Sequence, residues 1–186
     1  MKYPRSIKFA CYTTQYYPDG DLYEYIRSAN PGFDYRVKYA VNALALVGRL
    51  HLKGFMNFDI KPDNIIVESS TTRKLLLGDV ETFIRQFDKP PKVHGTFCYH
   101  HPLFYNGNVD SLDTSSINGF NIDAAAIAHT MYWIIFQQEC QGEIRFGADL
   151  NLLFSNSQLP KRVAYIILEL TAQYKQINRA ITDLEV

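Results

Sequence analysis

An acid, a base and an amide lie within six consecutive residues in the middle of this chain. Asp59 begins this segment, Lys61 follows, and Asn64 ends it. A helical spacing of apolar residues between Asp34 and Gly54 precedes the segment, and two short apolar runs follow it. Regular elements on both sides hold such a loop in one place, and polar residues held in this way are often functional. The pattern therefore predicts a functional loop between a long helix and a β-structure.

The two apolar runs after the loop predict a β-hairpin. Ile65 to Val67 and Leu75 to Leu77 are aliphatic, and a polar turn from Ser69 to Arg73 separates them. Near the amino terminus, residues 7–17 are rich in β-branched and aromatic side chains and run into Pro18-Asp19-Gly20. This second pattern predicts a strand that ends in a turn.

Helical spacing covers most of the remaining chain. We expect Asp21 to cap a short helix through Ile26, and Asp34 to cap a long helix that stops at Gly54. The segment from Val80 to Asn121 has many turn-forming residues and little periodicity, which is typical of functional loops. The other expected helices are Asp123–Gln137, Ala148–Phe154, Lys161–Tyr174 and a short last one after Asn178. The predicted class is α+β and mostly helical.

The composition predicts one globular domain over residues 1–186, because 47% of the residues are hydrophobic. The 19 basic and 19 acidic residues cancel, so we expect neither nucleic acid nor a membrane surface as partner. No apolar run approaches the roughly 20 residues that span a bilayer, and no secretory signal is evident. Cys11, Cys98 and Cys140 lack metal or disulfide spacing and are expected to be small apolar residues. The expected location is intracellular, cytoplasmic or nuclear.

The residues from Leu50 to Val67 read LHLKGFMNFDIKPDNIIV, and this segment resembles the catalytic loop of eukaryotic-type protein kinases. The resemblance implies a catalytic loop over residues 57–64, with Asp59 as the catalytic base and Lys61 as a phosphate-contacting lysine. Asn64 then matches a magnesium ligand. Because proline follows Lys61, the resemblance is to the Ser/Thr kinases rather than the tyrosine kinases.

The resemblance extends along most of the chain. Asp79 matches the second magnesium ligand and opens an activation segment over residues 79–103, and Ile66 matches the floor of an adenine slot. Residues 7–17 resemble the hinge strand. The resemblance also implies structural roles for Asn57, Phe58, Thr96, the buried helical Asp123, and Arg179.

The resemblance covers only the carboxy-terminal lobe of a kinase, with a small β-hairpin. The chain contains no G-x-G-x-x-G loop, and no residue matches the phosphate-binding strand lysine. Asn57 and Phe58 replace the family's histidine and arginine, and Val80 and Glu81 replace a phenylalanine and a glycine. We expect the apolar column between residues 57 and 80 to be poorly filled and Glu81 to fix one loop conformation.

Further departures affect the activation segment. Loss of the loop arginine removes the usual partner of an activation-loop phosphate, so control by phosphorylation is not expected. Leu103 replaces a glutamate that pairs with Arg179, so we expect Arg179 to find another acceptor or to turn to solvent.

These features favour a catalytically impaired, kinase-like binding module, viral or otherwise parasitic, that docks on a kinase or a kinase substrate and modulates signalling in a host cell. Asp59 would then serve the loop structure, with Lys61 and Thr96 as neighbours, and ATP and magnesium would bind weakly. The helix at 148–154 matches a docking surface. One alternative is a minimal or split Ser/Thr kinase, using Asp59 as base and Asn64 and Asp79 for magnesium, completed by a chain that supplies an upper lobe. Another is a scaffold that self-associates.

Overall fold

The computed structural model describes residues 14–85, 88, 96, 99, 119–138 and 148–172. The helices are α1 (Leu22–Ala29), α2 (Phe33–Leu52), α3 (Gly119–Phe136), α4 (Ala148–Ser155) and α5 (Lys161–Ala172). The strands are β1 (Phe55–Met56), β2 (Ile65–Ser69), β3 (Lys74–Leu77) and β4 (Ile84–Arg85), and the 3-10 turns are η1 (Pro62–Asn64) and η2 (Val80–Thr82). The described part of the chain is therefore mostly helical α+β, as the sequence predicts.

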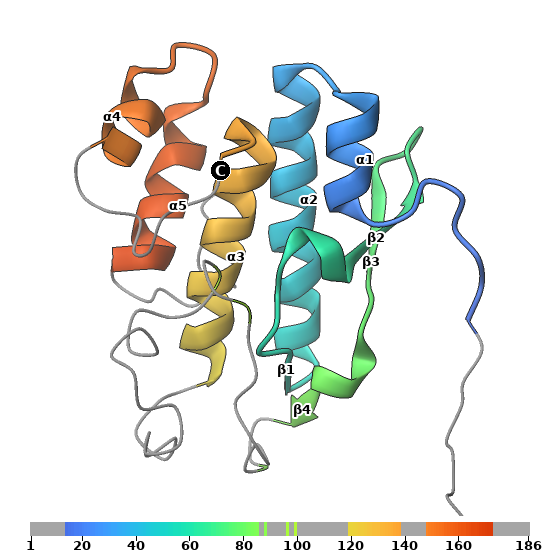
Figure 1. Cartoon of the computed structure of the whole chain (residues 1–186). Coiled ribbons are helices and arrows are strands. Elements are labelled where there is room, and N and C mark those ends of the chain that lie inside the picture. The colour runs from blue at the N-terminus through green and yellow to red at the C-terminus, as the bar shows by residue number, and fades with distance from the viewer. Residues whose placement is uncertain are drawn as a thin grey trace, which may run out of the picture.

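Two long helices form the centre of the fold. In Figure 1, α2 and α3 stand side by side, with α1 and the β2–β3 hairpin beyond α2, and α5 and α4 beyond α3. Helix α3 is buried along nearly its whole length because its residues are apolar on every side. Trp133 and Ile134 lie in the core, and the Tyr23 ring of α1 stacks on Trp133 at 4.6 Å between ring centroids. This segment is part of the hydrophobic core.

The helix boundaries follow the capping residues, with one correction. The Asp21 carboxylate accepts a 2.8 Å hydrogen bond from the Glu24 backbone N–H, so the predicted cap of α1 is confirmed. For α2 the prediction was wrong, since Gly32 is the N-cap and Asp34 lies inside the first turn. The helix begins earlier because the Phe33 ring packs on Phe136, 6.3 Å away, and the Gly32 carbonyl accepts the first helical hydrogen bonds.

The two sheets differ in how far the sequence predicts them. The β2–β3 hairpin is antiparallel, pairs Ile65 with Leu77, and confirms the prediction. The pairing of β1 with β4 lies in a region predicted to lack regular structure, because two-residue strands carry no detectable periodicity. Residues 14–17 form no strand, contrary to the expected hinge strand, since they have no ladder partner in the described structure. The turn after them is confirmed, with Gly20 at φ +70.

The turn of the hairpin is fixed to α2, which positions the loop between them. The Tyr39 hydroxyl donates to the Ser70 carbonyl at 3.3 Å, and the Asn42 amide donates to the Arg73 carbonyl at 3.0 Å. Burial raises the pKa of the Tyr39 phenol, and a hydrogen bond with Tyr25 raises it further. These contacts hold residues 57–64 between two rigid elements.

Several predictions lie outside the described residues. They concern Cys11, Cys98, Cys140, Arg179, Leu103, the helix after Asn178, and most of the activation segment and hinge strand. Helix α5 is described to Ala172 and the expected end at Tyr174 lies beyond it. Within the described ranges, no helix combines the length and the apolar character needed to cross a membrane.

Candidate functional site

A buried carboxylate on α3 holds the start of the loop. Asp123 is fully buried, and its two oxygens accept hydrogen bonds of 2.9 Å from the backbone N–H groups of Asn57 and Phe58. Phe58 has a φ of +66, a conformation that is costly for a bulky side chain. Because the Asp123 carboxylate binds the N–H groups on this strained segment, it fixes a conformation that the loop would not adopt alone. The structural role expected for Asp123 agrees with this geometry.

The sequence analysis missed a third partner of this carboxylate. His51, in the last turn of α2, brings its Nε2 atom to 2.8 Å from Asp123, and its ring packs at 4.6 Å from that of Phe120. His51 is 7% exposed. Its position near the carboxyl end of a long helix, shortly before the loop, is the only sequence signal that it offers. Helices α2 and α3 and the loop therefore meet at one buried carboxylate.

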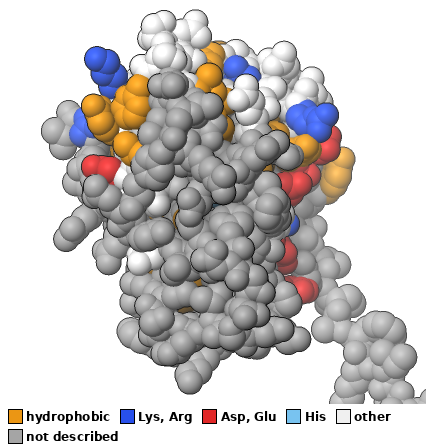
Figure 2. Space-filling model, turned by 60° about the vertical axis from the view of Figure 1, so that its left-hand side comes forward, with side chains coloured by type: hydrophobic (Ala, Val, Ile, Leu, Met, Phe, Trp, Pro, Cys, Tyr) orange, Lys and Arg blue, Asp and Glu red, His pale blue; other side chains and the backbone are white. Residues whose placement is uncertain are grey.

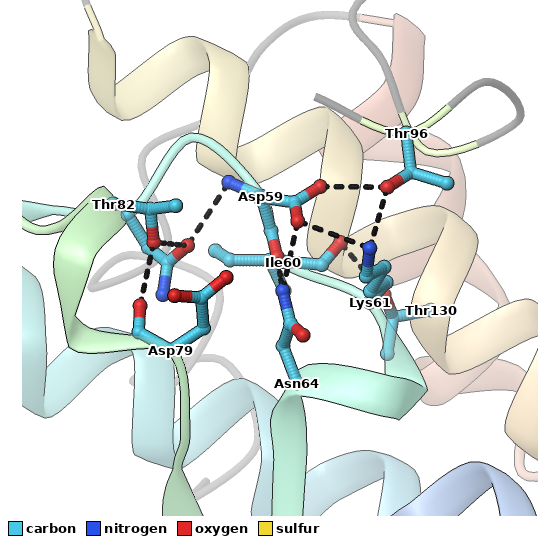
Figure 3. A network of polar contacts seen from close by, with 9 residues as sticks. Asp59, Ile60, Lys61, Asn64, Asp79, Thr82, Thr96 and Thr130 are labelled. Atoms are coloured by element: carbon cyan, nitrogen blue, oxygen red, sulfur yellow. Dashed lines mark hydrogen bonds and ion pairs between the residues drawn. The ribbon is translucent and has the colours of Figure 1, made fainter. Parts of the chain in front are cut away.

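Lys61, Asn64 and Thr96 surround the Asp59 carboxylate (Figure 3). We call these four residues, Asp59 included, the Asp59 cluster. The Thr96 hydroxyl donates to Asp59 Oδ1 at 2.8 Å, and the Asn64 amide donates to Oδ2 at 2.8 Å. The Lys61 ammonium lies 3.1 Å from Oδ2 and donates to the Thr96 hydroxyl at 2.7 Å. The structure thus places Lys61 and Thr96 beside Asp59, as expected. Both oxygens of the carboxylate are engaged within the fold.

A polar contact joins the loop to the segment that follows Asp79. The Asn57 side-chain oxygen accepts from the Asp59 backbone N–H and from the Thr82 hydroxyl, each at 2.9 Å. The Thr82 hydroxyl also lies 2.9 Å from the Asp79 carbonyl. Sequence reasoning did not assign this role to Thr82, because only the fold brings residue 82 to residue 57.

The apolar column between residues 57 and 80 is poorly filled, as predicted. Val80 is 53% exposed, whereas Asn57 is fully buried with its amide nitrogen unpaired among the described residues. Residues 80–82 form the turn η2, with the left-handed conformation at Asp79, φ +45, rather than at Glu81. Glu81 therefore fits this turn without backbone strain, and the expectation that it fixes one loop conformation stays a prediction. The connection between the two segments is made by hydrogen bonds.

Two oxygen donors at the site remain available. The Asp79 carboxylate makes no side-chain hydrogen bond or ion pair with the described residues, and its side chain points toward the cluster in Figure 3. Asn64 uses its amide nitrogen, and its side-chain oxygen makes no hydrogen bond with the described residues. No group of three or more acidic, His or Cys residues that could hold a metal occurs among the described residues. Magnesium fits this donor set, because it commonly takes one or two protein oxygens and completes its shell with water and phosphate.

A hollow of about 530 Å³ opens beside these donors. Ile66, Leu77 and Val80 contribute apolar surface to its wall, and Tyr16 at its rim is 83% exposed. Gly78 passes close to the loop, since its N–H donates to the Asn64 carbonyl at 2.8 Å and a Cβ atom would lie 3.4 Å from that oxygen. The structure therefore places Ile66 and Asp79 on the wall of one accessible space, and Asn64 is joined to that wall through its backbone contact with Gly78.

Known proteins resemble this chain in sequence and in fold. No protein-family model matches it. Serine/threonine-protein kinase SBK1 of Danio rerio is 29% identical over 117 residues, which are 62% of this chain and 29% of that protein. A crystal structure of a Toxoplasma gondii specific rhoptry antigen kinase domain superposes with a TM-score of 0.61 at 14% identity. That match covers 89% of this chain and 52% of the other.

These comparisons define the class of the protein. The chain is protein kinase-like, and its fold matches part of a kinase domain. It spans about half of the solved kinase domain and less than a third of the curated relative. The resemblance inferred from the residues around Asp59 is therefore confirmed at the level of the superfamily.

Proposed function

We propose that this chain is a catalytically impaired kinase-like module, equivalent to a carboxy-terminal lobe, that docks on a kinase or a kinase substrate and modulates signalling. One observation carries the proposal: both oxygens of Asp59 are engaged within the fold, while the Asp79 carboxylate makes no hydrogen bond or ion pair with the described residues. Asp59 therefore has a structural task that does not depend on phosphoryl transfer.

The substitutions near the site support impairment. Phosphoryl transfer depends on positioning and electrostatic stabilisation, and loss of one preorganised donor commonly slows such reactions by about a hundred- to a thousandfold. Phe58 stands where the resemblance places an arginine, and its side chain is buried. A phenyl ring offers no charge to an activation-loop phosphate. The Phe58 side chain therefore contributes to packing rather than to binding a phosphate.

The hollow beside Asp79 supports weak nucleotide binding. Ile66 and Leu77 would contact one face of an adenine ring, while Asn64 and Asp79 would hold a magnesium ion that neutralises the phosphates. Among the described residues, nothing covers Tyr16 and Val80 on the open side. A nucleotide held on one face should bind with a Kd in the millimolar range, or about 4 kcal/mol.

An apolar surface on the α4–α5 side supports a protein partner. Phe154 is 40% and Tyr165 54% exposed, and their rings pack edge to face at 5.1 Å. Figure 2 turns this side of the molecule forward and shows hydrophobic side chains at the surface in its upper part. Exposed aromatic pairs are common at interfaces, where they are buried by the partner. Helix α4 includes the stretch that the sequence analysis assigned to docking.

The test of this function combines capture with a catalytic assay. We expect tagged chain and its Asp59→Asn variant to capture the same kinase or kinase substrate from host extracts, and to change the phosphorylation rate at least twofold in a purified reaction. A Phe154→Asp/Tyr165→Asp variant should lose capture, whereas Lys161→Glu should retain it. Failure to capture any kinase or kinase substrate would contradict the proposal.

A second candidate is a minimal or split Ser/Thr kinase, and the assembled Asp59 cluster favours it. In that function Asp59 would accept the proton of a substrate hydroxyl. The oxygen of that hydroxyl would attack the γ-phosphorus of ATP, and ADP would leave. Lys61 would stabilise charge on the transferred group, and magnesium at Asn64 and Asp79 would neutralise the phosphates. The substrate hydroxyl would have to displace Thr96 from Asp59, because Thr96 now occupies the acceptor.

Transfer of labelled γ-phosphate separates the two candidates. If the chain labels itself or a substrate, and Asp59→Asn and Asp79→Ala each abolish the signal, the chain is an active kinase and impairment is refuted. If all three proteins are equally silent, Asp59 serves structure in this chain. Adding a separately expressed upper lobe tests the split form of the same activity.

A further inference from the structure

Positive side chains gather along one surface of the fold, away from Asp59 and Asp79. Tyr35, Lys38, Asn42, Ala45 and Arg49 recur at spacings of three and four residues on α2, so they share one face of that helix. The β2–β3 turn lies against the same face and adds Arg73 and Lys74. A hollow of about 400 Å³ lies between the two elements. We call this hollow, together with the adjoining Tyr35 and Lys38 on α2, the α2–hairpin groove; the hollow itself is lined by Asn42, Ala45, Arg49, Thr72, Arg73, Lys74 and Leu75.

Most of the positive charge of the groove has no acidic partner among the described residues. Lys38, Arg49 and Arg73 make no ion pair with the described residues. Lys74 is paired with Glu68, with 2.7 Å between its ammonium nitrogen and the carboxylate oxygen. The whole chain has 19 basic and 19 acidic residues, so this concentration of charge is local. A local field of one sign attracts a ligand of the opposite sign.

The groove is held rigid before any ligand binds. Asn42 donates to the Arg73 carbonyl at 3.0 Å, and Tyr39 donates to the Ser70 carbonyl at 3.3 Å. Two cations lie near the Tyr35 ring, with Lys38 Nζ 5.4 Å and Arg73 Cζ 5.7 Å from its centroid. These contacts fix the turn against the helix. A preorganised groove loses little entropy when a ligand binds.

The size of the surface indicates what it accommodates. From Tyr35 to Arg49 the helix axis rises by about 21 Å, at about 1.5 Å per residue. An extended peptide covers that distance with about six residues, at about 3.3 Å per residue. Ala45 and Leu75 give the floor apolar contact, while Arg49 and Arg73 offer forked donors that suit carboxylates.

We propose that the α2–hairpin groove binds an acidic linear segment of a partner protein in an extended conformation. The carboxylates of the segment would pair with Arg49, Arg73 and Lys38, and its backbone would lie along Ala45. This inference goes beyond the proposed function, because binding at the groove requires neither catalysis nor regulation of a kinase.

The test uses a fluorescein-labelled heptaglutamate peptide and the full chain. We expect measurable binding at low ionic strength that weakens with added salt, and no binding of heptalysine. The Arg49→Glu/Arg73→Gly variant should weaken binding at least tenfold. Glycine suits the left-handed backbone at residue 73, where φ is +57, so loss of the side chain should not unfold the turn.

A matched control removes the effect of net charge. Lys161 and Arg162 are exposed on α5, and the Lys161→Glu/Arg162→Gln variant, which changes the net charge as much as the groove variant does, should change peptide binding less than threefold. The proposal is overturned if this control weakens binding as much as the groove variant, or if heptaglutamate does not bind. Tighter binding of duplex RNA or of anionic phospholipid vesicles at the same groove would overturn it in favour of those ligands. Thermal unfolding of each variant verifies that the fold is retained.

Discussion

The two aspartates that the kinase resemblance pairs at the site have opposite surroundings. Asp59 is bound by three side chains through two hydrogen bonds and an ion pair, whereas Asp79 is exposed and its carboxylate makes no hydrogen bond or ion pair with the described residues. The first residue has a task in the folded chain itself, and the second has a task only if a ligand binds. Retention of an acidic residue in such a chain therefore has two separable explanations.

The largest effect on stability is expected at Asp123, the buried carboxylate on α3. Asp123→Ala should lower the free energy of unfolding by about 3–5 kcal/mol, because buried N–H groups and His51 lose their acceptor. Urea denaturation measures this loss. Asp123→Asn, which keeps one acceptor oxygen, should lose less. A loss below about 1 kcal/mol for the alanine variant would show that the loop is held by other contacts.

The second largest loss of stability is expected at Asp59. Asp59→Ala should lower stability by about 1–3 kcal/mol without any nucleotide, since Asn64, Lys61 and Thr96 lose their common partner. The same denaturation experiment measures it, with magnesium and ATP omitted. A variant as stable as the unmodified chain would remove the structural explanation for Asp59 and favour the kinase candidate.

A smaller loss of stability is expected when the hydrogen bond between Thr82 and Asn57 is removed. Thr82→Val keeps the shape of the side chain but removes its hydroxyl, so it should cost about 0.5–1.5 kcal/mol. Thr71 is exposed on the hairpin turn, and Thr71→Val serves as the control, with a change within about 0.5 kcal/mol. Equal effects of the two substitutions would mean that the hydrogen bond to Asn57 contributes nothing.

The smallest effect on stability is expected at Asp79. Asp79→Asn should change the free energy of unfolding by no more than about 0.5 kcal/mol, because the side chain is exposed and asparagine tolerates the left-handed backbone. The same variant should weaken magnesium-dependent binding of ATP, which calorimetry at millimolar nucleotide can follow. A stability loss equal to that of Asp59→Ala would erase the contrast between the two aspartates.

Local patterns in the sequence predict the parts of the fold that depend on neighbouring residues. The cap at Asp21, the hairpin from Ile65 to Leu77 and the long helix after Gly32 follow from spacing and turn chemistry. The expected strand before Tyr17 is wrong over residues 14–17, since a strand also requires a partner at hydrogen-bonding distance.

Contacts between distant segments account for what the sequence alone does not predict at the site. His51 and Asp123 are separated by 72 positions, and Thr82 reaches Asn57 across 25. No periodicity links such pairs, so only the assembled fold reveals them. The resemblance predicts Asp59, Lys61 and Thr96 as neighbours because it supplies a three-dimensional arrangement along with the motif.

The dependence of the loop on α3 has a consequence for how the protein is made. The chain leaves the ribosome in order, at about 5–20 residues per second, so Asp123 emerges about 3–13 seconds after Asp59. Until then the N–H groups of Asn57 and Phe58 lack their carboxylate acceptor, and the apolar faces of α2 lack α3. A nascent chain paused between these positions would expose core surface to chaperones. The core would form only after α3 had been synthesised.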